Sequence, residues 1–218
     1  NGERIAIFNI RTAEELAGLA KLVRNGNSMK NTMINLVSDV TLNDTTNFDN
    51  WDEQPPANNW TAIGAVPIEA PNVNVVMTIQ PECRNTVFAG MFNGNGHTIS
   101  GMYSLHHNYA GLFARTSGII TNVIVKDSYI QCINTQKVES GDTALWEACA
   151  GGITAICDRG VISHCEFDGK IFASGLNQVG YGTHGSFAGG IVGKFSDDEN
   201  GVAAVVMMFA LVPAGFLI

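Results

Sequence analysis

The chain has 218 residues, of which 45% are hydrophobic and 15% are charged, and its net charge is −8. This length predicts a single domain over residues 1–218, and the apolar content excludes a disordered chain. The acidic balance, with no basic stretch, argues against a nucleic-acid partner.

The first predicted elements are a β-strand at 5–10 and a helix at about 13–24. Thr12 precedes the helix, with Glu15 three residues later, which is the spacing of a capping box. Gly26 is placed to end the helix in a left-handed conformation. One apolar stripe runs along the helix, made of Leu16, Leu19, Ala20 and Val23. We expect residues 1–30 to cap the open end of a repetitive β-structure, because such an end exposes core and unpaired backbone.

The next stretch, 32–42, alternates apolar and polar residues with a break at Val37-Ser38. This pattern predicts one or two half-buried strands. Residues 43–59 form a polar loop that contains Pro55-Pro56 and is longer than most ordered connections. A further β-prone run rich in Val, Met and Ile lies at 72–80.

An Ala-Gly step recurs along the rest of the chain and predicts coils over 31–200. It occurs at residues 89, 110, 150 and 188, which are 21, 40 and 38 residues apart. Such periods are typical of solenoids. A second repeated element, a glycine followed by a short apolar run, begins at Gly96, Gly118 and Gly160. Asn122 and His164 then fall at equivalent turn positions. Either the preference of such polar residues for turns or hydrogen bonding between coils explains them.

The tail at 201–218 has no charged residue. Its length is at the lower limit for a membrane span, but Pro213 and Gly215 interrupt it and no Lys or Arg follows. We interpret it as a final coil or an atypical tail, so a membrane partner is expected only if this tail anchors the chain.

The five cysteines, an odd number without a CxxC pair, indicate neither a disulfide framework nor a zinc ribbon. We expect them to be small buried side chains. They are Cys83, Cys132, Cys149, Cys157 and Cys165.

Several segments in this order resemble the GLUG-motif surface proteins of gut-associated bacteria, whose repeats also flank immunoglobulin A-cleaving metalloproteases. The segments are IRTAEELAGLAKLVRNGNS (10–28), INLVSDVTLN (34–43), NWTAIG (59–64), MFNGNGHTISGM (91–102), AGLFARTSGIITNVIVKDSYI (110–130) and AGGITAICDRGVISHC (150–165). The resemblance covers residues 5–195 and implies a right-handed parallel β-helix on an exported cell-surface adhesin, with its signal peptide removed. The chain departs from the family pattern after Lys194.

Catalytic motifs are sparse in the sequence. It has no His-Glu-x-x-His zinc-protease motif, no Gly-x-Ser-x-Gly elbow and no phosphate-binding loop, so we expect no metal, no cofactor and no enzyme activity. The alternative is a β-helix polysaccharide lyase or hydrolase, which needs carboxylates on one face of adjacent coils. The candidates for such a site are Asp127, Asp142, Asp158, Glu166 and Asp168.

A non-catalytic role in adhesion needs exposed rings that can contact a glycan or a surface protein. Trp51 and Trp146 lie in polar excursions, where either ligand contact or burial as a local plug is expected, and Tyr129 is a further candidate. Tyr103 is another ring that could be offered. Trp60 is predicted to pack under the loop.

Overall fold

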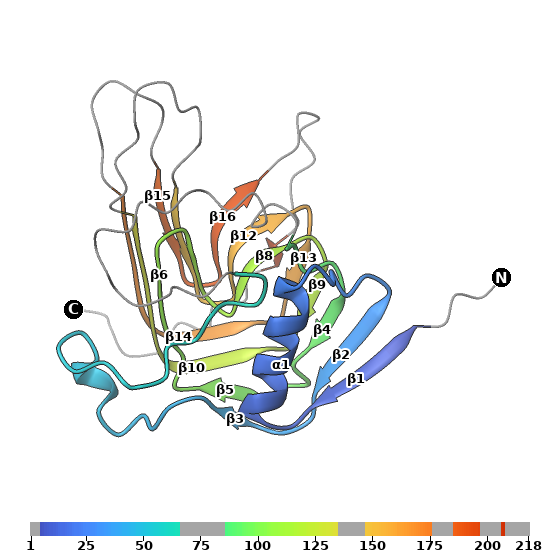
Figure 1. Ribbon diagram of the computed structural model, residues 1–218, viewed down its shortest axis with the longest axis horizontal. Helices are drawn as coiled ribbons and strands as arrows, with labels where there is room; N and C mark the ends of the chain where they lie inside the picture. The colour runs from blue at the N-terminus through green and yellow to red at the C-terminus, as the bar shows by residue number, and fades with distance from the viewer. Residues whose placement is uncertain (1–4, 66–85, 135–146, 176–184, 197–205, 208–218) are drawn as a thin grey trace.

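The computed structural model describes residues 5–65, 86–134, 147–175, 185–196 and 206–207 and is mostly β-structure, with a single α-helix in those residues (Figure 1). Sheet A consists of β1 (Ala6–Ile10), β2 (Thr32–Leu36), β4 (Met91–Asn93), β9 (Ile119–Thr121), β13 (Val161–Ser163) and β17 (Val206–Met207). Sheet B consists of β3 (Val40–Thr41), β5 (Thr98–Ser100), β10 (Ile124–Asn134) and β14 (Glu166–Gly175), and β6 (Tyr103–His106) also pairs with β10. Sheet C consists of β8 (Phe113–Thr116), β12 (Thr154–Asp158) and β16 (Val192–Ser196), and sheet D of β7 (Tyr109–Ala110), β11 (Ala148–Gly151) and β15 (Ser186–Gly189).

The strands follow a repeating order through the four sheets. From β4 onward the described chain passes through sheets A, B, D and C in turn, and it makes this round three times before β17 returns to sheet A. Every strand pair in the described residues is parallel. The predicted all-β class with parallel sheets is therefore confirmed.

The core is built from side chains that stack in register on successive strands. In sheet A, Ile34 pairs with Phe92, which pairs with Ile120, and Ile120 pairs with Ile162. All four are buried in the main hydrophobic cluster. Because neighbouring strands lie about 4.8 Å apart, each apolar side chain rests directly on the one below it. The period-2 alternation along each strand thus becomes a continuous apolar column inside the molecule.

The helix α1 (Ala13–Arg24) begins and ends where the sequence predicts. The hydroxyl of Thr12 accepts a hydrogen bond from the backbone N–H of Glu15 at 3.2 Å, and Gly26 follows the helix with a φ of 94°. Leu16, Leu19, Ala20 and Val23 are buried against the main core. Figure 1 shows α1 in front of the parallel strands, at the end where the first strands lie.

The repeat alignment is correct at three of its four Ala-Gly steps. Ala110, Ala150 and Ala188 pair in register in sheet D. The first step is different, because Ala89-Gly90 directly precedes β4 in sheet A. The four steps therefore belong to two different positions in the repeat, one before a sheet A strand and one at the end of the sheet D strands, and both need a small residue pair because backbone atoms approach closely there.

The second repeated element needs the same kind of correction at its first position. Gly118 and Gly160 each precede a sheet A strand, as aligned, but their counterpart is Gly90 and not Gly96. A Cβ on Gly118 would lie 2.0 Å from the carbonyl oxygen of Gly90, so the backbones touch at this corner. The residues after Gly96 instead form β5, which pairs with β10 in sheet B.

Other local predictions agree with the structure where it describes them. The 32–42 stretch forms two strands, β2 and β3, with the break between them. Cys132, Cys149, Cys157 and Cys165 are free and buried. Val206 and Met207 of the predicted tail pair in parallel with β13. The β-prone run at 72–80, Cys83 and the rest of the tail lie outside the described residues, and no helix within those residues is long and apolar enough to cross a membrane.

Candidate functional site

The polar loop at 43–59 is folded against the face of sheet B that points away from the main core. Residues of β10 alternate, with Ile130 and Cys132 in the main core and Tyr129 in a separate aromatic cluster with Trp51 and Tyr103. The loop contains one turn of 3₁₀ helix, η1 (Phe48–Asn50), and supplies Trp51 to this cluster.

Aromatic rings of the loop pack edge to face against one another and against the sheet, and two tyrosine rings of the sheet are stacked. The Trp51 ring meets Phe48 with centroids 5.3 Å apart at 84°, and meets Tyr103 at 6.1 Å and 86°. Tyr103 stacks on Tyr129 at 5.6 Å and 21°. Such pairs each add about 0.5–1.5 kcal/mol beyond the area they bury. The cluster therefore fixes the loop to the sheet.

This packing decides between the two expectations for the loop tryptophan. Only 2% of the Trp51 surface and 4% of the Tyr129 surface is exposed. Trp51 is thus the local plug, and neither ring presents an open face to a ligand. Burial also raises the pKa of the Tyr103 and Tyr129 hydroxyls. Trp60 is packed as predicted, 5% exposed, with its indole N–H donating to the Leu112 carbonyl at 3.4 Å. Trp146 lies outside the described residues.

An open cleft of about 490 Å³ lies in the loop itself. Its lining is mostly amide, hydroxyl and carboxylate side chains, with two prolines. The lining residues are Asn43, Asp44, Thr46, Asn47, Trp51, Gln54, Pro55, Pro56 and Ala57. This volume is within the range of small-ligand sites, roughly 300–1,000 Å³.

Side-chain hydrogen bonds hold the base of the cleft. The Asn43 amide donates to the carbonyls of Asn58 and Gly101, both at 2.9 Å, so it joins the two ends of the loop to the sheet. The Asn58 amide donates back to the Leu42 carbonyl at 3.1 Å. On the far side, Lys170 of β14 donates to the Asp49 carbonyl at 2.7 Å and lies 5.4 Å from the centre of the Phe48 ring.

The rim of the cleft is polar and acidic. Asp44 accepts hydrogen bonds from the Thr46 hydroxyl at 2.6 Å and the Thr46 N–H at 2.9 Å, and these bonds lower the pKa of its carboxyl. Gln54 is exposed and accepts a hydrogen bond from the Asn47 amide at 3.5 Å. The loop carries four acidic residues, Asp44, Asp49, Asp52 and Glu53, and no Lys or Arg, so its formal charge is −4.

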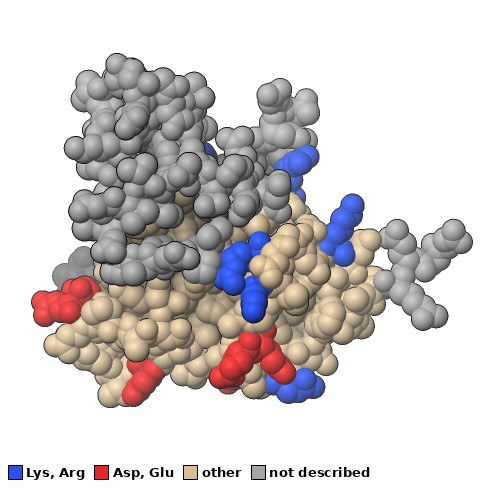
Figure 2. Space-filling view, viewed as in Figure 1, with Lys and Arg blue, Asp and Glu red and all other residues tan. Residues whose placement is uncertain are grey.

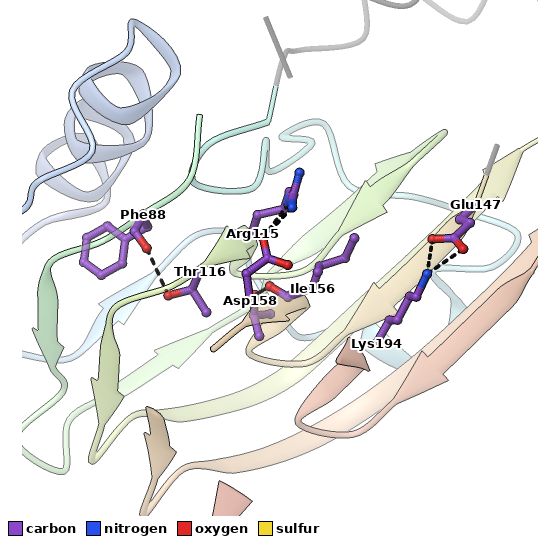
Figure 3. A network of polar contacts seen from close by, with 8 residues as sticks. Phe88, Arg115, Thr116, Glu147, Ile156, Asp158 and Lys194 are labelled. Carbon is purple, nitrogen blue, oxygen red and sulfur yellow. Dashed lines mark hydrogen bonds and ion pairs between the residues drawn. The ribbon is translucent and has the colours of Figure 1, made fainter. Parts of the chain in front are cut away.

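The predicted carboxylate candidates that the structure describes do not form one group. Asp158 is paired with Arg115 of β8, whose Nε lies 2.9 Å from its Oδ2, and this contact joins adjacent strands of sheet C (Figure 3). Figure 3 also shows Lys194 donating to Glu147, with Nζ 2.6 Å from Oε2. Both pairs are partly buried, with side-chain exposures of 16–27%.

Two of the other candidates do come to neighbouring strands. Asp127 and Asp168 lie beside the register shift between Val125 and Ser128, where β10 carries one residue more than β14. Both are exposed, as is Glu166 earlier on β14, while Asp142 lies outside the described residues. In the described part of the chain, no three His, Cys, Asp or Glu side chains are grouped closely enough to hold a metal ion.

The polar lining of the cleft and the contact of Lys170 with the loop were not predicted from the sequence. The Asp44-Thr45-Thr46 sequence is a signal for a side-chain-to-backbone turn and could have marked the rim. The contact with Lys170 joins residues 121 positions apart, and no local pattern carries it.

Comparison with known protein families, with curated proteins and with solved structures finds no match for this chain. The resemblance to GLUG-motif proteins is therefore carried by the quoted segments alone.

Proposed function

We propose that this protein is a non-catalytic adhesion and recognition protein of the bacterial cell surface that binds a glycan in the cleft of the 43–59 loop. The observation that carries this proposal is the cleft itself, whose hydrogen-bonding side chains sit on a loop fixed in place by Trp51, Asn43 and Lys170. A site fixed in this way loses little conformational entropy when a ligand binds.

The chemistry of the lining favours a sugar over an apolar ligand. Amide groups donate and accept, and carboxylates accept, the paired hydrogen bonds that adjacent sugar hydroxyls offer, and the prolines give apolar surface for C–H groups. The charge of −4 on the loop disfavours anionic sugars, because like charges repel across a partly solvated cleft. We therefore expect a neutral glycan.

The proposed scaffold is a right-handed parallel β-helix with α1 as its N-terminal cap. Three rounds through sheets A, B, D and C with parallel pairing support it, since parallel strands joined by a repeated path are what such a helix requires. The proposed extracellular location follows from the resemblance to GLUG-motif surface proteins.

The test is a glycan array followed by calorimetry on the intact protein and two variants. Gln54→Ala removes a cleft amide that is exposed, and we expect at least a tenfold weaker Kd, about 1.4 kcal/mol, for any neutral glycan that the wild type binds. Gln131→Ala, a glutamine of β10 outside the cleft, is the matched control and should bind as the wild type does. An array signal confined to sialylated or uronic acid glycans would contradict the proposal, as would equal affinity of the two variants.

A second candidate is a β-helix polysaccharide lyase or hydrolase, and the specific feature in its favour is the bulge beside Asp127 and Asp168. Bulges are frequent next to active sites. The expected sign of this alternative is cleavage of a polysaccharide that Asp127→Asn abolishes and Gln54→Ala does not. If neither variant changes a measured cleavage rate, the bulge is not the site.

A further inference from the structure

The face of sheet A that points away from the core carries two rows of side chains. Along each strand the residues alternate, so the neighbours of the buried column that includes Phe92 and Ile120 point outward. The first outward row is apolar and consists of Ile7, Met33, Met91, Ile119 and Val161. The second is polar and consists of Asn9, Asn35, Asn93, Thr121 and Ser163.

Both rows are accessible to solvent and uncharged. Ile7 is 63% exposed, Ile119 is 37% exposed and Val161 is 41% exposed, and the two methionines between them are half-buried. In the polar row Asn9 is exposed and the other four side chains are half-buried. The chain as a whole has a net charge of −8. In Figure 2 the surface at the right, where Figure 1 draws β1 and β2, has the colour of uncharged residues.

Hydrogen bonds orient the side chains of the polar row. The Asn93 Oδ1 accepts from the Asn122 amide at 3.1 Å and from the Asn95 backbone N–H at 3.0 Å. The Ser163 hydroxyl donates to the Thr121 hydroxyl at 3.0 Å. An amide side chain has two donors and two acceptor lone pairs, and a hydroxyl has one donor and two lone pairs. The row is therefore held in place and keeps hydrogen-bonding capacity, which lowers the entropy cost of binding a ligand.

The two rows repeat at the spacing of the strands. Neighbouring strands lie about 4.8 Å apart, so five strands present five pairs of one apolar and one polar side chain over about 19 Å. The strands are β1, β2, β4, β9 and β13. Their spacing is close to the length of one sugar unit in an extended β-linked polysaccharide. Each unit of such a chain has an apolar C–H face and hydroxyl groups at its edge, which fit the two rows.

We infer that this face of sheet A binds one extended chain of a neutral polysaccharide, which lies across the five strands. Its C–H groups lie on the apolar row, and its hydroxyls bond to the polar row. The repeat favours a polymer, because a compact ligand would contact only one or two strands. An anionic chain would meet no cation in either row and would be repelled by the acidic protein. No residue of the rows lines the cleft of the 43–59 loop, so this site is separate from the one proposed above.

Calorimetry of the intact protein with oligosaccharides of increasing length tests the match between sugar units and strands. The probes are cello-, manno- and N-acetylchito-oligosaccharides of two to seven units. For at least one series we expect the Kd to fall with each added unit up to about five and then to stay constant, because five strands contribute one pair each. Gln54→Ala, which weakens the cleft, should leave this length dependence unchanged. A Kd equal for two and seven units, or no binding in all three series, would overturn the inference.

A lysine in the apolar row tests the contact with the sugar C–H groups. Ile119 lies between Met91 and Val161 in the row, and Ile119→Lys should raise the Kd of a five-unit probe at least tenfold. Leu22→Lys is the matched control, because Leu22 of α1 is 48% exposed and lies outside both rows. Circular dichroism checks that both variants fold. Equal affinity of the two folded variants would contradict the inference.

The removal of one hydroxyl tests the polar row separately. Thr121→Val keeps the shape of the side chain and should raise the Kd of the five-unit probe at least threefold. Thr41→Val is the matched control, because Thr41 forms the same kind of hydroxyl pair, with Ser100 at 3.1 Å, but in sheet B. It should bind as the wild type does. If Thr121→Val also binds as the wild type does, the polar row does not contact the sugar, and the inference fails.

Discussion

Gly96 and Gly101, in the connections before and after β5, show that one residue type can be required for two different reasons. Both have left-handed φ angles, 71° and 77°. A Cβ on Gly96 would meet open space, but a Cβ on Gly101 would lie 2.3 Å from the carbonyl oxygen of Asn43. Gly101 is therefore needed for its conformation and also for the close approach of the loop base to the sheet.

Both glycines have left-handed φ angles, so an alanine at either position adds similar backbone strain. The difference between the two variants therefore measures the steric clash alone. Gly96→Ala should cost about 1–2 kcal/mol, the strain of a left-handed alanine. Gly101→Ala adds a clash with the backbone of Asn43, so we expect it to lower the free energy of unfolding by at least about 1 kcal/mol more and to weaken any ligand of the cleft. Urea denaturation measures both costs. Equal costs would show that the loop base shifts freely and that the cleft is not held by this contact.

At the scale of single elements, α1 was predictable because its signals are local. Its cap, its apolar stripe and its terminal glycine all lie within 15 residues of one another, and each acts on its neighbours in the chain. The corner at Ala89-Gly90 was not predictable in the same way. This connection and the ends of the sheet D strands both demand small residues, so only the strand pairing tells them apart.

The sequence predicted the cleft only in part, because local composition indicates a polar loop but not what packs under it. The composition of 43–59 indicated a polar, exposed loop, and its polar rim agrees with this. The burial of Trp51 depends on Tyr103 and Tyr129, which lie more than 50 residues away in the chain. A pattern within the loop alone cannot distinguish an exposed tryptophan that could bind a ligand from one that is already packed against other aromatic rings.

The Thr12 cap of α1 offers a test at the element scale. Thr12→Ala leaves the Glu15 N–H without its 3.2 Å acceptor, and loss of such a cap typically costs about 1 kcal/mol. Because α1 covers the main core, we expect this cost in the global unfolding free energy and not only in local fraying. Thr12→Ser keeps the hydroxyl and should recover most of the loss. Thermal denaturation that is unchanged in Thr12→Ala would mean that the helix docks independently of its cap.

At the scale of the whole molecule, the ionisation of four buried thiols depends on whether the stack of parallel strands is intact. They come from β10, β11, β12 and the residue before β14. Burial raises the pKa of all four, to about 12 for Cys149 and about 11 for Cys157 and Cys165. Each thiol must be exposed to water before it can ionise readily, so its ionisation is linked to unfolding of the stack.

The sign of the resulting pH dependence is fixed by linkage. Between the ordinary thiol pKa near 8.5 and the raised folded values, the unfolded chain has lost protons that the folded chain still holds. The free energy of unfolding must therefore fall as the pH rises through about 8.5 and above, by at most about 1.4 kcal/mol per pH unit for each thiol. The raised pKa values of Tyr103 and Tyr129 act in the same direction at higher pH.

Urea denaturation at pH 7.5, 9 and 10.5 measures this loss. The midpoint should be lower at pH 9 than at pH 7.5, and lower again at pH 10.5. Cys149→Ala removes one titrating group with a small change in volume and should flatten the fall between pH 9 and 10.5. If the midpoint stays constant to pH 10.5 in the wild type, the thiols are open to solvent in the folded protein, and the parallel sheets do not enclose one continuous core.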